Sequence, residues 1–409
     1  MNRLICFGLA LALSAGAAEV SVSGSLRSRI EAWDWFSGSP YAFNGNILRV
    51  AITGKQEGWS WNVELAAPIL LGLPTTAAGG TGANYLAAND RRGSSAMIFP
   101  KQAYVFWKGL KVGRFEYVDG TEFTPSNPTL AALKRERIAH RLIGHFAWTH
   151  VGRSFDGFHL NKPVNGMNLT VVGAAPTRGV FQVDGWAPLK IGFGYAALSG
   201  GKKNYDWRLF TLSYKDWRVP FAREVQTYGG HLIGTVGQFD YLAWTAIQHK
   251  GNATALEAGY QPKGLLWKPW IRGGVFHGSS RFFNVLPTPR IYARLPFYNL
   301  MNNQDRFGSL ILRPHAKLNI RGDFHALRLA DAKAPYYSGG GAFQPWTLGY
   351  VARPSGGARS LGNLADIGAD YNANKNVTFS AYYGKVLGRS VLQKQNAQFA
   401  YAEITYRFQ

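Results

Sequence analysis

Cysteine, acidic residues and long apolar runs are all scarce in this sequence of 409 residues. The one cysteine, Cys6, lies inside the apolar run at residues 4–13, so the rest of the chain contains none. Disulfides, zinc–cysteine sites and a cysteine nucleophile are therefore excluded there. No stretch approaches the about 20 apolar residues that a membrane-spanning helix needs. Such a chain can still be integral to a membrane if it crosses as strands, because each strand shows lipid only every second residue.

The first residues have the three parts of a secretory signal peptide. Asn2 and Arg3 form a charged start, residues 4–13 are apolar, and residues 15–18 (AGAA) offer a small-residue cleavage site. The apolar run is too short for an N-terminal membrane anchor, and Cys6 lies too far upstream to carry a lipid. We expect residues 1–18 to be a signal peptide and residues 19–409 to form an outer-membrane β-barrel.

Acidic residues are few: 23 Asp and Glu face 45 Lys and Arg, which gives a formal net charge of +22. No nucleic-acid-binding module is recognisable in the sequence, and we expect no nucleic-acid partner. The excess positive charge has two interpretations. Either the basic residues face anionic lipopolysaccharide or lie in solvated loops, or they line a lumen that attracts anions. The sequence leaves both open.

Enzyme motifs are also lacking. The sequence has no G-x-S-x-G and no H-E-x-x-H, and its nine histidines are scattered, with His140, His145 and His150 closest together. These three have no metal-ligand spacing. We therefore predict no enzyme, no metal and no cofactor. An outer-membrane hydrolase remains the enzymatic alternative.

What the sequence does contain is strict alternation at both ends of the mature chain. Residues 399–409 (FAYAEITYRFQ) place Ile404 and Tyr406 on one face and Glu403 and Arg407 on the other. Residues 20–30 (VSVSGSLRSRI) show the same apolar and charged faces. Two such terminal strands can pair and close a sheet, and a membrane requires that closure, because an open edge in lipid leaves backbone groups unsatisfied.

Alternating or aromatic-rich runs of roughly 8–12 residues recur about eighteen times, as expected of a single-chain barrel. Long connections follow the odd-numbered runs, at residues 68–96, 118–152, 277–306 and 330–363. Short turns follow the even-numbered runs. This order predicts an all-β fold, a single transmembrane antiparallel barrel in the cell outer membrane, with long extracellular loops and short periplasmic turns.

One loop segment, residues 129–140 (TLAALKRERIAH), has helical composition. It either folds over or into the pore, or it is a solvated surface helix.

Charged residues recur on the face opposite the apolar one. A charge on the lipid face costs about 2–4 kcal/mol for Arg or Lys at mid-membrane, so these residues should point inward and line the pore. Arg114 is difficult to place, because it shares parity with Leu110 and Val112; a bulge at Gly113 would turn it inward. The residues that this pattern selects are Arg27, Arg29, Glu31, Arg49, Glu257, Arg272, Arg321, Asp323, His325, Asp366, Asp370, Glu403 and Arg407.

Several segments resemble the alginate-export family of outer-membrane porins. They are LRSRIEAWDWF, KVGRFEYVDGT, the RSFDG that begins at Arg153, and two long segments between Asn284 and Tyr337 (NVLPTPRIYARLPFYNLMNNQD and RPHAKLNIRGDFHALRLADAKAPYY). The resemblance implies an 18-stranded monomeric barrel whose arginine-rich lumen passes an anionic polysaccharide. It implies these wall residues: Arg27, Arg29, Arg49, Arg114, Arg153, Arg321, Arg328, Asp156 and Asp323. The chain departs from the family at residues 287–290 and 293–296, in a loop that could gate the pore.

We therefore predict a passive channel for anionic solutes, in the first place an anionic polysaccharide or uronate oligomer. The alternatives are a general small-anion porin, a plugged adhesion barrel and an outer-membrane hydrolase. The expected partners are outer-membrane lipid and lipopolysaccharide, together with a periplasmic export protein. We expect a monomer.

Overall fold

The computed structural model describes residues 19–36, 38–75, 79–218, 223–288, 294, 297–337 and 352–409. The expected signal peptide at residues 1–18 lies outside these ranges, as do loop residues 289–293 and 295–296.

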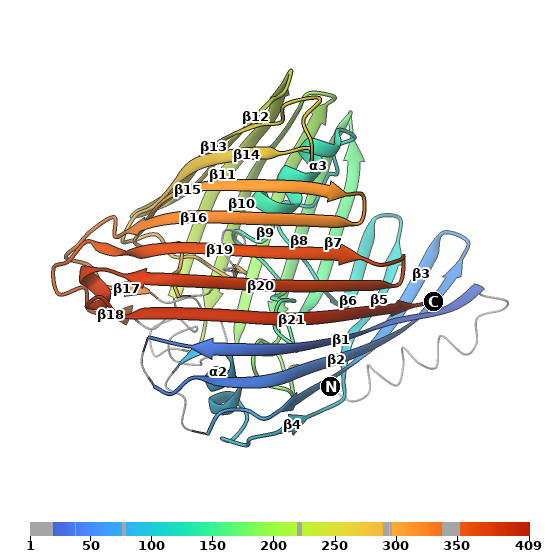
Figure 1. Cartoon of the computed structure of the whole chain (residues 1–409). Coiled ribbons are helices and arrows are strands. Elements are labelled where there is room, and N and C mark those ends of the chain that lie inside the picture. Colours follow the sequence, from blue (N-terminus) through green and yellow to red (C-terminus); the bar gives the residue numbers. More distant parts are fainter. Residues whose placement is uncertain are drawn as a thin grey trace.

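The described residues form one antiparallel sheet of 19 strands and a separate two-stranded pairing (Figure 1). The two-residue β4 (Ser95–Ala96) pairs only with β3, so eighteen strands make the wall, as the sequence predicted. The separate pairing joins β17 (Tyr336–Tyr337) to β18 (Ala352–Arg353). The wall strands are β1 (Glu19–Asp34), β2 (Tyr41–Gln56), β3 (Trp59–Leu71), β5 (Phe99–Trp107), β6 (Leu110–Phe115), β7 (Phe155–Val164), β8 (Met167–Pro176), β9 (Ile191–Lys202), β10 (Tyr205–Asp216), β11 (Arg223–Val236), β12 (Phe239–Gln248), β13 (Gly251–Tyr260), β14 (Trp270–Gly278), β15 (Asn303–His315), β16 (Leu318–Arg328), β19 (Ser360–Asn372), β20 (Val377–Gly388) and β21 (Asn396–Phe408).

The sheet closes on itself, because β1 pairs with β21 as well as with β2. In this seam Leu26 lies opposite Tyr406, and Arg29 lies opposite Glu403. Closure leaves the wall without a free edge, which is the condition for spanning lipid with strands. Both predicted terminal strands are confirmed.

The connections alternate between short turns and longer loops, as predicted, except that only His249 and Lys250 join β12 to β13. The β5–β6 turn at Lys108 and Gly109 and the β7–β8 turn at Asn165 and Gly166 have positive φ at both central residues. Two-residue hairpins need this left-handed conformation, which glycine adopts without a steric cost. The longest described connections leave the opposite end of the barrel, which is therefore the extracellular end.

The two faces of each strand differ as the alternation predicts. In β1, Leu26 and Ile30 are exposed on the outside, while Arg29 and Glu31 between and beside them are buried. Other strands of the wall also carry exposed apolar side chains on their outer face. They include Leu48, Leu209, Leu232, Ile271, Leu310, Phe324, Ile367, Phe379 and Ile404. A continuous apolar belt of this kind faces lipid. Among the described residues, no helix is long and apolar enough to cross a membrane.

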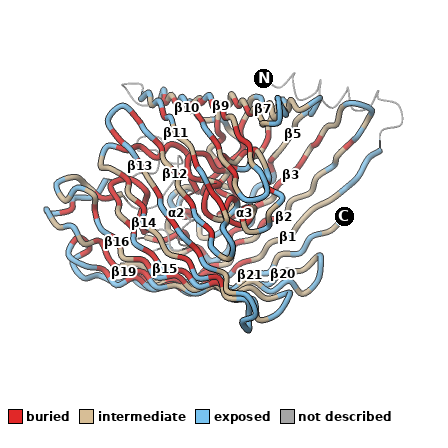
Figure 2. The backbone as a smooth tube through the Cα atoms, turned by 90° about the horizontal axis from the view of Figure 1, so that it is seen from above, coloured by how far each residue is buried: buried red, intermediate tan, exposed pale blue. Residues whose placement is uncertain are grey.

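The interior contains protein as well as charged wall residues. Figure 2 shows α2 (Gly80–Ala88) and α3 (Pro128–Leu133) inside the ring of strands. A π-helical turn, η1 (Lys134–Ile138), continues α3, and a 3₁₀ turn, η3 (Ser390–Leu392), connects β20 to β21. Two buried apolar clusters pack these loops against the inner wall, one under α3 and one beneath α2.

A charge on the lipid face should destabilise the barrel according to its depth. We expect Leu26→Arg, near the middle of β1, to lower the free energy of unfolding by about 2–4 kcal/mol, and Val20→Arg, near the end of β1, by about 0–1 kcal/mol. Denaturant unfolding in lipid vesicles measures both. Equal losses at the two positions would contradict the lipid-facing assignment.

Candidate functional site

The long β6–β7 loop, residues 116–154, enters the barrel through α3. Asn127 caps this helix: its side-chain oxygen accepts hydrogen bonds from the backbone N–H groups of Thr129 and Leu130. Leu130 and Leu133 are fully buried against the inner wall. Of the two interpretations of residues 129–140, the structure therefore selects the helix folded into the pore.

Buried ion pairs fasten this helix to the wall. Lys134 Nζ lies 2.8 Å from Asp206 of β10. Arg137 Nε lies 2.9 Å from Glu257 of β13, and Arg141 reaches the same carboxylate at 3.3 Å. All of these side chains are at most 4% exposed. Removing one partner from such a buried pair is costly, because the other charge stays in a low-dielectric site.

A second cluster fixes the start of the same loop. Arg208 of β10 donates hydrogen bonds to Asp119, Glu122 and the hydroxyl of Tyr195. Burial alone would raise the pKa of the Glu122 carboxyl, but Arg208 and the Tyr195 hydroxyl outweigh it and lower this pKa to about 2. The loop is therefore tied down by charge at both ends of its helical part.

The second half of the loop crosses to the seam of the barrel. Arg27 donates to the backbone oxygens of Ala147 and Thr149, and Arg29 donates to that of Trp148 at 3.0 Å. Arg29 also forms an ion pair with Glu403 at 2.6 Å. The two predicted arginines of β1 thus hold the loop as well as the seam.

The β14–β15 loop, residues 279–302, joins the first loop inside the barrel. Leu286 donates its N–H to Leu142 O at 2.8 Å, and its carbonyl accepts from Gly144 N at 2.9 Å. These bonds flank a parallel bridge between Ile143 and Leu286. The two loops are therefore joined by backbone hydrogen bonds inside the barrel.

Side-chain exposure varies along the inner wall, with Arg29, Glu31 and His325 buried and other inward charges partly exposed. Beneath the loops, on β10 and β13, Arg208 and Glu257 are fully buried. On the half formed by β16, β19–β21 and β1–β3, Arg49 and Arg321 are 23% and 24% exposed, and Arg294 is 33% exposed. Charged side chains that point inward and remain partly exposed mark an open channel, so the candidate pore runs along this second half.

Carboxylates accompany the arginines of the pore wall. Arg49 lies 2.6 Å from Glu64 and 2.8 Å from Glu116. Arg294 lies 3.4 Å from Asp370. Arg27 is an intermediate case: its nearest carboxylate, Glu403, is 3.7 Å away, and its closest bonds go to backbone oxygens. The wall therefore alternates donors with acceptors instead of presenting bare positive charge.

The structure places the predicted wall residues in five groups, of which Arg114 and Asp156 are described separately below. Arg272 is buried beneath the loops, bonded to Glu257 and Asp240. Arg153 is buried immediately before β7. Arg328, the last residue of β16, is exposed at the extracellular rim. The remaining inward-facing set is Arg27, Arg29, Glu31, Arg49, Arg321, Asp323, Glu403 and Arg407.

Arg114 and Asp156 differ from the expectation and lie on the outer side of the wall. Arg114 shares a face with the exposed Val112, while its neighbour Phe115 is fully buried inside. No register shift occurs on either side of β6, so no bulge at Gly113 turns Arg114 inward. Arg114 lies directly opposite Asp156, and Nε and the carboxylate are 2.7 Å apart. Pairing the two charges reduces the cost of their outward position.

Several interior charges were not selected from the sequence. Asp206 and Arg208 alternate with Trp207 and Leu209, so alternation could have identified them. Lys101 could not be found this way: the pairing of β3 with β5 shifts beside it, and this irregularity turns its side chain inward. There Lys101 donates to the backbone oxygens of Val151 and Arg153.

The fold and its lipid-facing belt define the class: the chain is an 18-stranded outer-membrane β-barrel. No family model matches the sequence, and no curated protein does. Solved structures do match the fold. OccAB3 of Acinetobacter baumannii has a TM-score of 0.59 at 9% identity, over 95% of this chain and 99% of that one. OpdO and OpdQ of Pseudomonas aeruginosa each have a TM-score of 0.61 at 10% identity, over 95% of this chain and 97% and 98% of theirs. At this identity the likeness concerns the fold alone.

Glu257 should be the main anchor of the pore loop. Glu257→Gln leaves Arg137, Arg141 and Arg272 buried without this carboxylate, so we expect the free energy of unfolding to fall by about 3–5 kcal/mol. The released loop should also raise single-channel conductance. Glu224→Gln is the matched control, because its pair with Lys215 is exposed and worth about 0–1 kcal/mol. Similar losses in the two variants would contradict the anchor role.

Loop packing should also weaken in acid. Burial and the nearby His145 lower the pKa of His140 to about 3, and burial likewise lowers the pKa of His145 and His150. In a released loop, these histidines would have the ordinary histidine pKa of about 6.5 and would bind protons below that pH. The packing is therefore fully stable above pH 6.5 and loses stability as pH falls toward 3. We expect conductance to rise between pH 6.5 and 4 and the rise to shrink in a His140→Gln, His145→Gln variant. A pH-independent conductance would be the contrary result.

Proposed function

We propose that this protein is a passive outer-membrane channel for anionic solutes, with a uronate oligomer or an anionic polysaccharide as its cargo. The observation that carries the proposal is the set of inward, partly exposed arginines on the open half of the barrel, at Arg27, Arg49, Arg294 and Arg321. Barrels of 16–18 strands leave an aqueous channel when loops do not fill them.

The pairing of the wall suggests how an anion would move. A solute carboxylate can exchange with a wall carboxylate as the partner of an arginine, because both make the same charge-assisted hydrogen bonds. Arg49 already divides its donors between Glu64 and Glu116. Binding that is favourable but shared between neighbouring sites lets an ion enter and leave, as conduction requires.

A second candidate, a porin for small anions, is favoured by the joined loops. The hydrogen bonds between Leu142, Gly144 and Leu286 hold the two loops together inside the barrel. A fixed constriction of this kind suits small solutes better than a polymer. The same proposal includes the partners of the barrel. We propose that it acts as a monomer, meets lipopolysaccharide through rim residues such as Arg328, and engages a periplasmic export protein.

Conductance in a planar bilayer tests the proposal. Under a salt gradient, the reversal potential should show anion preference. Arg27→Gln, Arg49→Gln and Arg321→Gln together should shift it toward cations, because the wall loses three positive charges: Glu64 and Asp323 lose their arginine partner, and Glu116 and Glu403 each lose one of two cationic partners. Arg306→Gln is the control, since Arg306 is exposed and shares the outer face of β15 with Leu310.

The two cargo classes are separated by blocking. Alginate that reduces the current where a neutral glucan does not would support polymer or oligomer passage. Conduction of small anions without any block would support the second candidate. Cation preference in the wild-type channel would overturn both, and a silent barrel would point to the plugged or enzymatic alternatives.

A further inference from the structure

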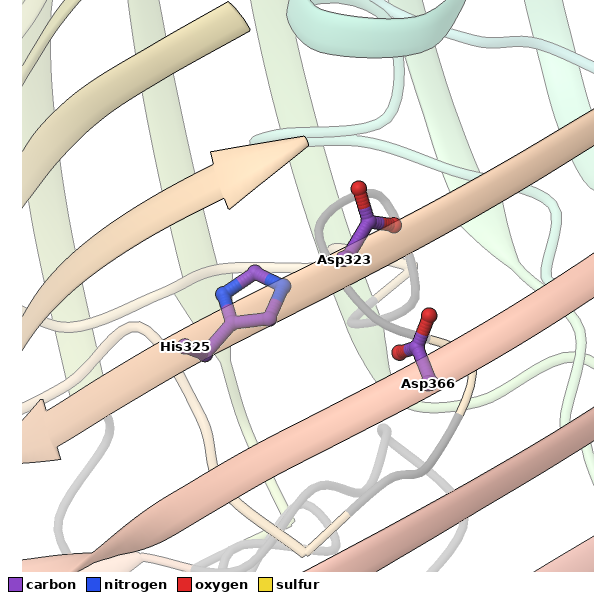
Figure 3. Close-up of side chains that lie close together, drawn as sticks. All are labelled: Asp323, His325 and Asp366. Carbon is purple, nitrogen blue, oxygen red and sulfur yellow. The ribbon is translucent and has the colours of Figure 1, made fainter. Parts of the chain in front are cut away.

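Three potential metal ligands converge on the inner wall where β16 meets β19 (Figure 3). Asp323 and His325 are two residues apart on β16 and therefore point to the same face. Asp366 of β19 lies directly opposite Asp323 in the register. One nitrogen or oxygen atom from each of the three side chains lies within 4.8 Å of the other two.

The histidine is oriented by a fourth residue. Its Nδ1 lies 2.8 Å from Asp305 of β15, and its ring stacks on Phe307 at 5.7 Å. His325 is fully buried, and its Nε2 has no hydrogen-bond partner among the described residues. A metal-ligating histidine is typically held this way, with one ring nitrogen on a carboxylate and the other directed at the ion.

The carboxylates also keep coordinating oxygens available. Arg321 Nε donates to one oxygen of Asp323 at 2.6 Å, and the other oxygen is buried without a described partner. One oxygen of Asp366 accepts from the Tyr382 hydroxyl at 3.1 Å. Two ligand atoms in the cluster are thus both buried and unsatisfied, which is costly in a protein interior.

The net charge of the cluster also favours a bound cation. Asp305, Asp323 and Asp366 carry three negative charges, and Arg321 returns one, which leaves two in excess when His325 is neutral. Asp323 and Asp366 are like charges directly opposite each other, an arrangement that destabilises a sheet. A divalent cation would neutralise the excess and use the unsatisfied atoms.

We propose that Asp323, His325 and Asp366 bind one divalent transition-metal ion, with Asp305 as the positioning residue. A set of one imidazole and two carboxylates suits Zn²⁺ and its neighbours, whereas Ca²⁺ and Mg²⁺ prefer all-oxygen sites. The partly exposed Arg321 shares the inner face of β16 with Asp323, so the site adjoins the open part of the barrel. Three protein ligands leave a coordination position for water or for an anionic solute.

Zn²⁺ binding to the untagged, chelator-treated barrel in detergent tests the proposal, by titration calorimetry and by metal analysis after dialysis. The expected result is one ion per barrel. Asp366→Asn and His325→Ala should lower the affinity by at least about tenfold, and Asp305→Asn, which acts through His325, by about 10–100-fold. Co²⁺ loading should give a visible absorption band that shifts in Asp305→Asn, which a merely structural role would not cause.

His249→Ala is the matched control, because His249 is exposed and far from this cluster in the sequence. It should bind as the wild type does. If His325→Ala does not fold, the isosteric Asp366→Asn still tests the proposal. The heat-dependent gel shift of a folded barrel shows whether each variant has folded. The proposal would be overturned if the wild type bound less than one Zn²⁺ per barrel, or if folded Asp366→Asn bound Zn²⁺ with unchanged affinity. Bound protons would then neutralise the aspartates instead.

Discussion

Closure of the sheet is the constraint on which the rest of this structure depends. Lipid offers no hydrogen-bond partner to a free strand edge, so a chain that spans a membrane with strands must return to its first strand. Here β21 pairs with β1 along its length, and Arg29 and Glu403 meet across the seam. Closure also creates an inside, where charged residues excluded from the lipid face must find partners.

The partners come from two sources. Some are cross-strand neighbours, such as Arg49 and Glu64. Others come from a loop that folds inward: Lys134, Arg137 and Arg141 meet carboxylates of β10 and β13. The same loop also reaches the other half, where its Glu116 pairs with Arg49 and its backbone accepts hydrogen bonds from Arg27 and Arg29. The loop is therefore fastened to the wall on both sides of the barrel.

The interior is balanced in detail, although the chain as a whole carries a formal charge of +22. On the inner wall, arginines lie beside carboxylates, so the anion preference that we propose would rest on exchange between partners more than on a bare positive field. Where β16 meets β19 the balance reverses, and three aspartates with one arginine leave negative charge in excess. Under our two proposals, one lumen would hold regions that bind anions and a region that binds a cation.

The sequence by itself determined the barrel: strand number, the inward and outward faces of β1 and β21, and the order of long and short connections all follow from alternation, which is local. It also indicated a helix at residues 129–140. Only the tertiary structure decided that this helix enters the lumen, that Arg114 and Asp156 face outward as a pair, and that Asp323, His325 and Asp366 converge. Those outcomes depend on strand register and on ion pairs between residues up to 374 positions apart, as in Arg29 and Glu403. Parity assigns a side chain to a face, but its partner across the barrel is fixed only when the sheet closes and the loops pack.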